Sequence, residues 1–135
     1  LEVSEKSRND FVSNADRGVE MLLREAIARD FPEDGVLGEE YGHEPGPSGV
    51  TWVIDPIDGT VNFFYGIPHF CISIAKRVAG ELVLGVIYDP MVNELWTVEK
   101  AGVAHLNGTP VTVSNRDKLE ESILFVGCGK DEEAR

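Results

Sequence analysis

The stretch WVIDPIDGT, residues 52–60, ends an apolar run with two carboxylates three positions apart, Asp55 and Asp58. Pro56 removes a backbone donor directly after Asp55, so we expect regular strand pairing to stop there. Gly59 permits a tight backbone path, and its amide can approach a ligand closely. This spacing predicts a bend at the end of a strand, with both carboxylates turned towards one point.

A second acidic pair, Glu39 and Glu40, follows the short apolar run at residues 35–38. If that run is a strand beside residues 51–55, Glu39 joins the two aspartates. Three ionised carboxylates about 5 Å apart, at an effective dielectric of about 20, repel one another by about 10 kcal/mol in total. That energy is comparable to the stability of a whole domain, so such a group takes up protons or holds a cation. Oxygen-only ligands favour Mg²⁺ first, then Mn²⁺ or Ca²⁺.

Other interpretations of these residues compete with a metal site. Asp-Pro and Asp-Gly pairs are ordinary turn formers, so DPIDG could be a simple loop. An EF-hand loop needs acidic residues at alternate positions, where this chain has Ile57. A phosphatase with an aspartyl nucleophile would need its aspartates two positions apart, and a plain Ca²⁺-binding module would need more clustered oxygen ligands. No Ser/His/Asp or Cys/His set is recognisable, and the three histidines are expected to be surface or structural residues: His43, His69 and His105.

The composition is that of one soluble folded domain, with 42% apolar and 27% charged residues in 135. A formal net charge of −12 repels nucleic-acid phosphates, so no DNA or RNA partner is expected. Gly66, Pro68 and His69 interrupt the longest apolar stretch, so neither a membrane-spanning helix nor a membrane partner is expected. Cys71 and Cys128 lack C-x-x-C spacing, which favours buried reduced thiols and a cytoplasmic location.

The elements that must position the acidic residues follow from the apolar periodicity. Residues 13–32 predict one long helix, capped by Ser13 or Asn14 and ended by Pro32. Residues 35–40 predict a strand, and the Gly- and Pro-rich residues 41–49 a loop. Further strands are expected at 51–55, 70–78, 82–89, 94–100 and 103–108, with 111–114 extending the last, a short helix or turn at 118–122 and a strand at 123–127. Short connections demand antiparallel pairing. The predicted fold class is therefore α+β, a long helix packed on a mainly antiparallel sheet.

Taken together, LGEE and WVIDPIDGTVNF strongly resemble the inositol monophosphatase family of metal-dependent, lithium-sensitive sugar phosphatases. DFVSNAD before the helix and GVIYDPMVNELWTVEKAGVAHLNGTPVTVS after it are also similar to family segments, so the resemblance covers about residues 6–127. It implies Mg²⁺-dependent hydrolysis of a phosphate monoester of inositol or a related small sugar or polyol by metal-activated water. Relatives with similar motifs act on fructose 1,6-bisphosphate, 3′-phosphoadenosine 5′-phosphate or histidinol phosphate. The second hypothesis is that the protein is a non-catalytic regulatory relative of these enzymes, and the presence of every acidic residue of the motif argues against it.

The resemblance also implies a role for each matching residue. Glu39, Asp55 and the carbonyl of Ile57 would hold a first Mg²⁺, Asp55 and Asp58 would contribute to a second, and Glu39 with waters would hold a third. Mn²⁺ would substitute and Li⁺ would inhibit. Gly59 and Thr60 would offer amides to the phosphate. Asp16 would support the Thr60 hydroxyl in deprotonating the attacking water, and Glu40 would support the metal ligands from behind.

Two departures from the family pattern stand out. Val61 occupies a position where the family often has Thr. The C-terminal W-D-x-A-A-G segment of the family, which supplies another aspartate and substrate contacts, is absent from this sequence. We therefore expect residues 1–135 to be the N-terminal metal- and phosphate-binding lobe of a two-lobed enzyme, incomplete as a catalyst without the C-terminal lobe. The resemblance is compatible with a homodimer.

Overall fold

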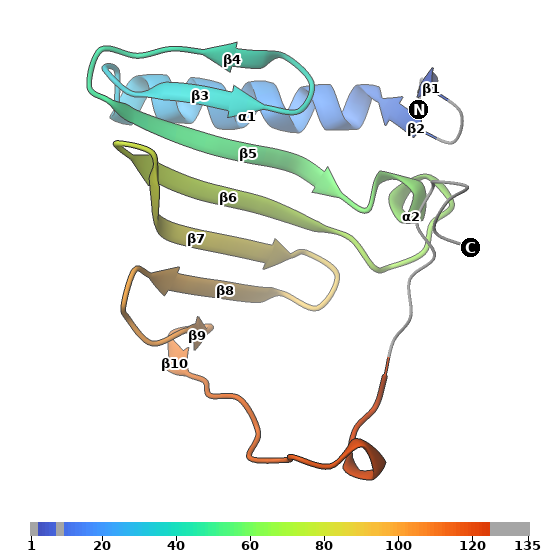
Figure 1. Ribbon diagram of the computed structural model, residues 1–135. Coiled ribbons are helices and arrows are strands. Elements are labelled where there is room, and N and C mark those ends of the chain that lie inside the picture. Colours follow the sequence, from blue (N-terminus) through green and yellow to red (C-terminus); the bar gives the residue numbers. More distant parts are fainter. Residues whose placement is uncertain (1–2, 8–9, 125–135) are drawn as a thin grey trace.

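The computed structural model describes residues 3–7 and 10–124, which form a mixed sheet with one long helix against it (Figure 1). The N-terminal elements are strands β1 (Val3–Ser7) and β2 (Asp10–Ser13) and helix α1 (Asn14–Asp30). The central elements are β3 (Gly35–Gly38), β4 (Gly42–Glu44), β5 (Val50–Asp58), helix α2 (Thr60–Phe64), β6 (Cys71–Val78), β7 (Glu81–Asp89) and β8 (Glu94–Glu99). Two short strands, β9 (His105–Leu106) and β10 (Thr109–Pro110), and a 3₁₀ turn at Leu119–Glu121 complete them.

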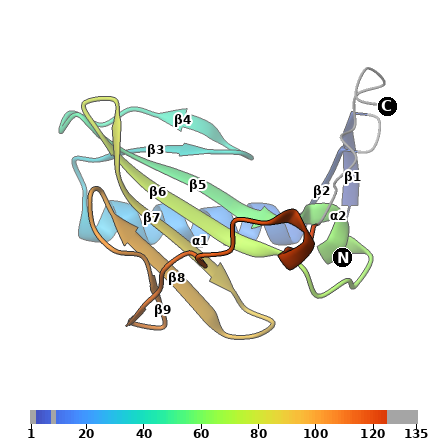
Figure 2. The same cartoon turned by 60° about the horizontal axis from the view of Figure 1, so that its bottom comes forward.

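Helix α1 covers one face of the sheet, as the two views of the ribbon agree (Figure 1, Figure 2). Its Ile27 packs with Val36 of β3 and Ile54 of β5, and Leu23, Trp52 and Ile74 surround this small core. The apolar periodicity that predicted the helix is confirmed at Ile27, which is 8% exposed, whereas Leu22 of the same helix is 66% exposed. The face of α1 that meets the sheet also carries two buried acidic residues, Asp16 and Glu20.

The larger sheet has eight strands in the order β10-β9-β8-β7-β6-β5-β3-β4, and every neighbouring pair except β3 with β5 is antiparallel. The mainly antiparallel α+β prediction is therefore confirmed. The parallel pair arises because the chain runs back through β4 before it enters β5. Side chains alternate between the faces of a strand. Asp55, Ser73, Ile87 and Trp96, which are successive register partners, therefore share the face opposite to Ile54.

Several predictions about individual elements were wrong. Residues 42–44, expected to belong to a loop, form β4 and pair with β3. The hairpin of β1 and β2 and the short helix α2 were not predicted from the sequence. Residues 111–114 are not in a strand, although the Val111 N–H donates to the Ala104 carbonyl oxygen at 2.8 Å. Residues 123–124 are not in a strand either, and the rest of the strand expected at 123–127 lies outside the described residues.

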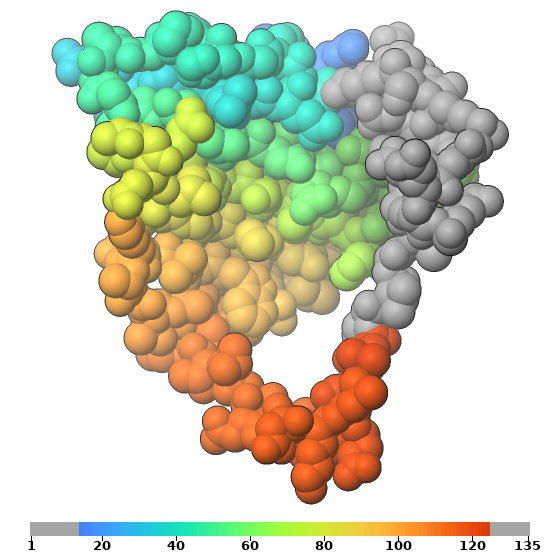
Figure 3. All heavy atoms as spheres, in the orientation of Figure 1, coloured from blue at the N-terminus to red at the C-terminus, as the bar shows by residue number. Residues whose placement is uncertain are grey.

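The segment after β10 leaves the body of the sheet. Figure 3 shows residues 111–124, in orange-red, as an arm beside the rest of the molecule. Val113 and Ile123 in this arm are 91% and 86% exposed. The short 3₁₀ turn at Leu119–Glu121 agrees with the expected helical piece at 118–122. No helix among the described residues is both long and apolar enough to cross a bilayer.

Candidate metal and phosphate site

The parallel pairing of β3 with β5 brings two acidic strand ends together. Gly38 of β3 is the register partner of Ile54 of β5. Because the two strands are parallel, the next residues along them, Glu39 and Asp55, lie side by side. The condition set by the sequence, that the strand before Glu39 neighbours residues 51–55, therefore holds. A hydrogen bond joins the Glu39 side chain to Asp55. Two carboxyl groups can form such a bond only when a proton lies between them.

The carboxylate of Asp55 is partly removed from water. Its Oδ1 atom is buried without a hydrogen-bond partner. Burial raises the pKa of Asp55, and the negative charges of Asp58 and Asp16 raise it further, while hydrogen bonds from the Ile57 backbone and Glu39 lower it. A desolvated carboxylate among other acids is stabilised by a proton or by a cation.

A bulge, and not the end of the strand, sets the position of Asp58. Regular pairing is interrupted after Asp55, as Pro56 predicted, but the prediction that the strand ends there was wrong, because β5 continues to Asp58. The register between β5 and β6 shifts between Asp55 and Asp58, and the ladder resumes where Asp58 faces Cys71. Pro56 lacks the amide that a regular ladder would use there, and the extra residues of the bulged strand re-aim its side chains. Asp58 is exposed, in contrast to the half-buried Asp55.

The turn after Asp58 uses the conformational freedom of glycine. Gly59 has φ of +98° in the left-handed region, and a Cβ at this position would lie 3.1 Å from the His69 carbonyl oxygen. Thr60 then begins α2, and its hydroxyl donates a hydrogen bond to the Ile57 carbonyl oxygen at 3.0 Å. The hydroxyl and the carbonyl that were both assigned roles from the sequence are thus direct neighbours.

Asp16 and Glu40 lie at the back of the site. Asp16, in the first turn of α1, is 2% exposed and close enough to Asp55 to raise the pKa of that residue. Its expected support of the Thr60 hydroxyl stays a prediction. The backbone N–H of Glu40 donates to Glu20, a buried residue that was not singled out from the sequence.

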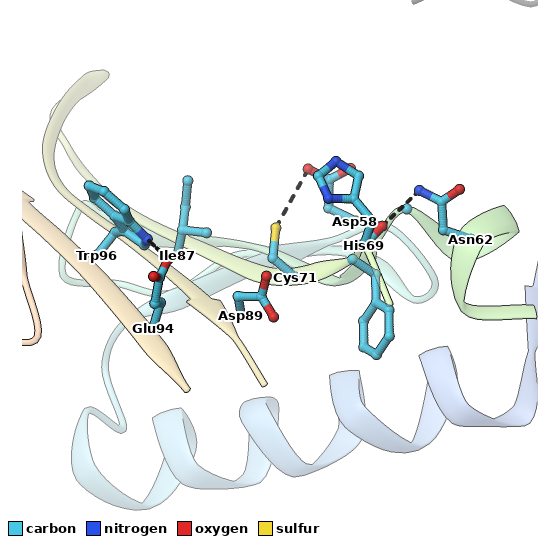
Figure 4. A pocket seen from close by; sticks show the side chains of 10 residues that line it. Asp58, Asn62, His69, Cys71, Ile87, Asp89, Glu94 and Trp96 are labelled. Atoms are coloured by element: carbon cyan, nitrogen blue, oxygen red, sulfur yellow. Dashed lines mark hydrogen bonds between the residues drawn. The ribbon is translucent and has the colours of Figure 1, made fainter. Parts of the chain in front are cut away.

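Beside Asp58 the sheet carries an open cavity of about 370 Å³. Figure 4 shows Asp58, Cys71, Asp89 and Glu94 around it, with His69 and Trp96 at its sides. Cys71 was expected to be buried, yet it is half-buried and lines this cavity; Cys128 lies outside the described residues. Asp89 and Glu94 were not predicted as site residues. The sequence signal that could have identified them is that Asp89 and Glu94 flank the turn PMVN. That position makes them register partners, at the end of β7 and the start of β8.

Of the aromatic residues after Thr60, Phe63 is half-buried, whereas Phe64 and Tyr65 are 38% and 66% exposed. Phe63 contacts Phe70 edge-to-face with ring centroids 5.1 Å apart, and Phe64 contacts Tyr65 at 5.0 Å. His43 and His69 are exposed and His105 is half-buried. Within residues 3–7 and 10–124, no three His, Cys, Asp or Glu side chains form a ready-made metal cluster. The ligand roles assigned from the sequence to Glu39, Asp55, Ile57 and Asp58 therefore stay predictions, as do the phosphate contacts of Gly59 and Thr60.

Comparison with known proteins identifies relatives of this fold and sequence. An inositol-1-monophosphatase of Rhizobium meliloti is 42% identical over 128 residues, which are 94% of this chain and 48% of the relative. A Salmonella typhimurium protein named Nus factor SuhB is 41% identical over the same shares of the two chains. The chain thus spans about half the length of the curated relatives it matches.

Solved structures agree with the sequence relatives. The native extragenic suppressor protein suhB of Bartonella henselae superposes with a TM-score of 0.86 at 41% identity, over 88% of this chain and 46% of that one. A staphylococcal inositol monophosphatase-1, solved as a lithium chloride-soaked inhibitory complex, gives a TM-score of 0.78 at 28% identity over 88% and 46%. The model of the inositol monophosphatase family matches residues 1–135. The chain therefore belongs to the inositol monophosphatase family.

Proposed function

We propose that this chain supplies the metal- and phosphate-binding part of a Mg²⁺-dependent phosphomonoesterase. The substrate is inositol phosphate or a related small sugar or polyol phosphate. The observation that carries this proposal is the buried Oδ1 of Asp55, which has no hydrogen-bond partner while Glu39 and Asp58 lie beside it. An unpaired carboxylate oxygen among other acids is costly unless a cation or proton satisfies it.

The donor set fits a hard divalent cation. Glu39, Asp55 and Asp58 offer carboxylate oxygens and Ile57 offers a backbone carbonyl, and Mg²⁺ prefers oxygen ligands of these kinds. Two or three Mg²⁺ ions are proposed, with Mn²⁺ as a substitute. A relative solved as a lithium chloride-soaked inhibitory complex supports inhibition by Li⁺. When bound, Mg²⁺ neutralises the charge of the phosphate and makes water acidic enough to react.

The residues of the chain hold and orient the reactants. In this proposal the Thr60 hydroxyl, which donates to the Ile57 carbonyl in the structure, takes a proton from the attacking water as it passes its own proton to Asp16. Buried Asp16 supports it from the first turn of α1. The Gly59 amide is proposed to donate to a phosphate oxygen, and the missing Cβ lets the turn pack closely against His69 and Phe70. Phosphoryl transfer needs little beyond such positioning and charge neutralisation.

The chain acts as the N-terminal lobe of a longer catalyst. It spans about half the length of its relatives, so contacts that select the substrate come from the other half. Fructose 1,6-bisphosphate, 3′-phosphoadenosine 5′-phosphate and histidinol phosphate are the alternative substrates. A cytoplasmic location is proposed because the cysteine spacing favours reduced thiols, and a homodimer is proposed from family membership.

A second candidate function is a role in assembly or regulation without catalysis. The relatives named Nus factor SuhB favour it. The acidic cluster favours the enzyme, because a binding module gains nothing from a desolvated Asp55.

The test uses Asp58→Asn in the whole protein that contains this sequence. The variant should fold like the wild type, judged by circular dichroism, and lose most Mg²⁺-dependent release of phosphate from inositol 1-phosphate. Asp117→Asn, at an exposed position in the arm, is the matched control and should keep wild-type turnover. A wild-type rate in Asp58→Asn would remove Asp58 from the site, and absence of turnover in the wild type would favour the assembly role.

A further inference from the structure

Glu20 is a fully buried acid on the sheet-facing side of α1. Its side chain is 0% exposed. It accepts hydrogen bonds from two successive backbone amides of the β3–β4 turn, Glu40 N at 2.7 Å and Tyr41 N at 3.2 Å. The first of these amides belongs to the peptide bond that joins Glu39 to Glu40. The helix therefore holds the peptide plane directly after Glu39.

Arg24 adds further contacts between α1 and the turn that Glu20 holds. Its Nε donates to Glu20 Oε1 at 2.9 Å, one helical turn away. Its Nη2 donates to the Gly42 carbonyl oxygen, and its Nη1 reaches Glu44 Oε2 at 3.4 Å. The buried charge of Glu20 is thus paired with a cation and with two amide dipoles, which is the condition for its burial. Both residues tie α1 to the hairpin of β3 and β4.

Gly38 leaves the space that this arrangement needs. A Cβ on Gly38 would overlap the Glu20 carboxylate. The glycine before Glu39 is therefore required by the close approach of a helix side chain. Its backbone φ is not in the left-handed region, so conformational freedom is not the reason.

We propose that Glu20 is the positioning residue for Glu39. By fixing the turn at residues 39–41, it holds the Glu39 carboxylate beside Asp55 at the proposed metal site. This inference rests on the proposed metal site and adds Glu20 of α1 to it, behind the proposed ligand Glu39. Partners behind a metal ligand commonly govern affinity by fixing the orientation of that ligand. Because Glu20 reaches Glu39 through the backbone, its effect does not depend on contact with metal or substrate.

The decisive variant is Glu20→Gln, which keeps the side-chain volume but removes the charge and one acceptor. Mn²⁺ binding to the chain is measured by calorimetry, and the melting temperature is measured separately. The dissociation constant for Mn²⁺ should rise about ten-fold or more in the folded variant. Glu25→Gln, at an exposed position on the same helix, should leave it unchanged. Gly38→Ala is the second variant, because it displaces the Glu20 carboxylate without altering it, and it should weaken Mn²⁺ binding in the same way.

Amide hydrogen exchange gives a readout that does not depend on metal. The Glu40 and Tyr41 amides should be protected like those of β5, and Glu20→Gln should release them while β5 and β6 stay protected. Two results would overturn the role of Glu20: unprotected Glu40 and Tyr41 amides in the wild type, or an unchanged Mn²⁺ affinity in folded Glu20→Gln. If Asp55→Asn still abolishes Mn²⁺ binding, the proposed metal site survives either result. Failure of the wild type to bind Mn²⁺ overturns the proposed site and this inference with it.

Discussion

Cys71 faces Asp58 across the β5–β6 pair, and its Sγ lies 3.9 Å from Asp58 Oδ2 (Figure 4). Burial raises the pKa of the Cys71 thiol, and the carboxylates of Asp58, Asp55 and Asp89 raise it further. Since the thiolate is the reactive form, this cysteine is protected from alkylation by the same charges that we propose to bind metal.

Replacing Asp58 should therefore make Cys71 more reactive. In a Cys128→Ser background, Asp58→Asn should shift the pH midpoint of iodoacetamide labelling downwards, because one repelling charge and one thiol acceptor are lost. Rates measured between pH 7 and 10 give the midpoint. Glu99→Gln, at an exposed position on β8 away from the cavity lining, is the control. An unchanged midpoint in Asp58→Asn would show that Asp58 does not govern this thiol.

Gly59→Ala should lower the free energy of unfolding by about 2 kcal/mol or more. Part of that is the cost of a left-handed alanine, about 1–2 kcal/mol, since φ is +98°. The rest comes from a Cβ 3.1 Å from the His69 carbonyl oxygen and 3.2 Å from Phe70 Cβ. Gly66→Ala is the matched control, because Gly66 has φ of +71° with open space around it. Urea denaturation should show a clearly larger loss at Gly59; equal losses would mean that packing at Gly59 relaxes freely.

Asp55→Asn should stabilise the metal-free chain at pH 7 while abolishing its stabilisation by Mg²⁺. The pKa of Asp55 is raised in the folded state, so ionisation costs stability as the pH rises above the ordinary carboxyl range. A neutral isostere removes that cost. The gain should be at most about 1 kcal/mol after solvent screening of a half-buried group, and it should vanish near pH 3. Thermal melts at both pH values, with and without Mg²⁺, check this. A variant less stable than wild type at pH 7 would contradict it.

Asp34→Asn should destabilise the chain at neutral pH but not in acid. The Ser48 hydroxyl donates to Asp34 Oδ1 at 2.7 Å and the Trp52 indole N–H to Oδ2 at 2.9 Å. The Ser48 hydrogen bond is the main cause that lowers the pKa of Asp34. Burial is the next largest effect and opposes it, and the Trp52 hydrogen bond and the charge of Lys76 lower the pKa by smaller amounts. Stability from a lowered carboxyl pKa is present above the unfolded value of about 3.9 and is lost as the pH falls through the folded value.

The expected loss in Asp34→Asn is about 1 kcal/mol at pH 7. Denaturation curves at pH 7, 5 and 3 should show wild type and variant converging only at the lowest pH. Curves that stay parallel throughout would show that the charge of Asp34 contributes nothing.

The sequence predicted the central elements because their signals are local. Apolar alternation located β6, β7 and β8, and the apolar stripe located α1. Glu20 and Leu22 reverse the expected pattern, with the acid at 0% exposure and the leucine at 66%. Local periodicity could not reveal this, because the partners of Glu20 are the amides of residues 40 and 41, in another element.

The strand β4 was not predicted from the sequence for a similar reason. Gly42 and its Gly- and Pro-rich surroundings are typical of loops, yet residues 42–44 pair with β3 while Arg24 and Glu20 from α1 hold the turn. Tertiary contacts therefore decided a segment that propensity assigned to a loop.

Of the candidate site, the neighbourhood of Glu39 and Asp55 was predictable, since both follow apolar runs that could pair. The bulge that sets the position of Asp58 could not be predicted, because Pro56 predicts a break in the pairing but not where the pairing resumes. Asp89 and Glu94 were missed because they come together only through the register of β7 and β8.

Glu39, Asp55 and Asp58 follow or end strands at one end of the sheet, while the connection from β4 to β5 and the β6–β7 turn lie at the other (Figure 1). Ala79 and Gly80, with φ of 49° and 88°, close that distant turn. Sequence inserted between them would lengthen a surface loop without moving Glu39, Asp55 or Asp58. That turn is the place to graft a fluorescent reporter or an affinity tag, and a place where descendants of this chain are free to vary in length without changing their chemistry.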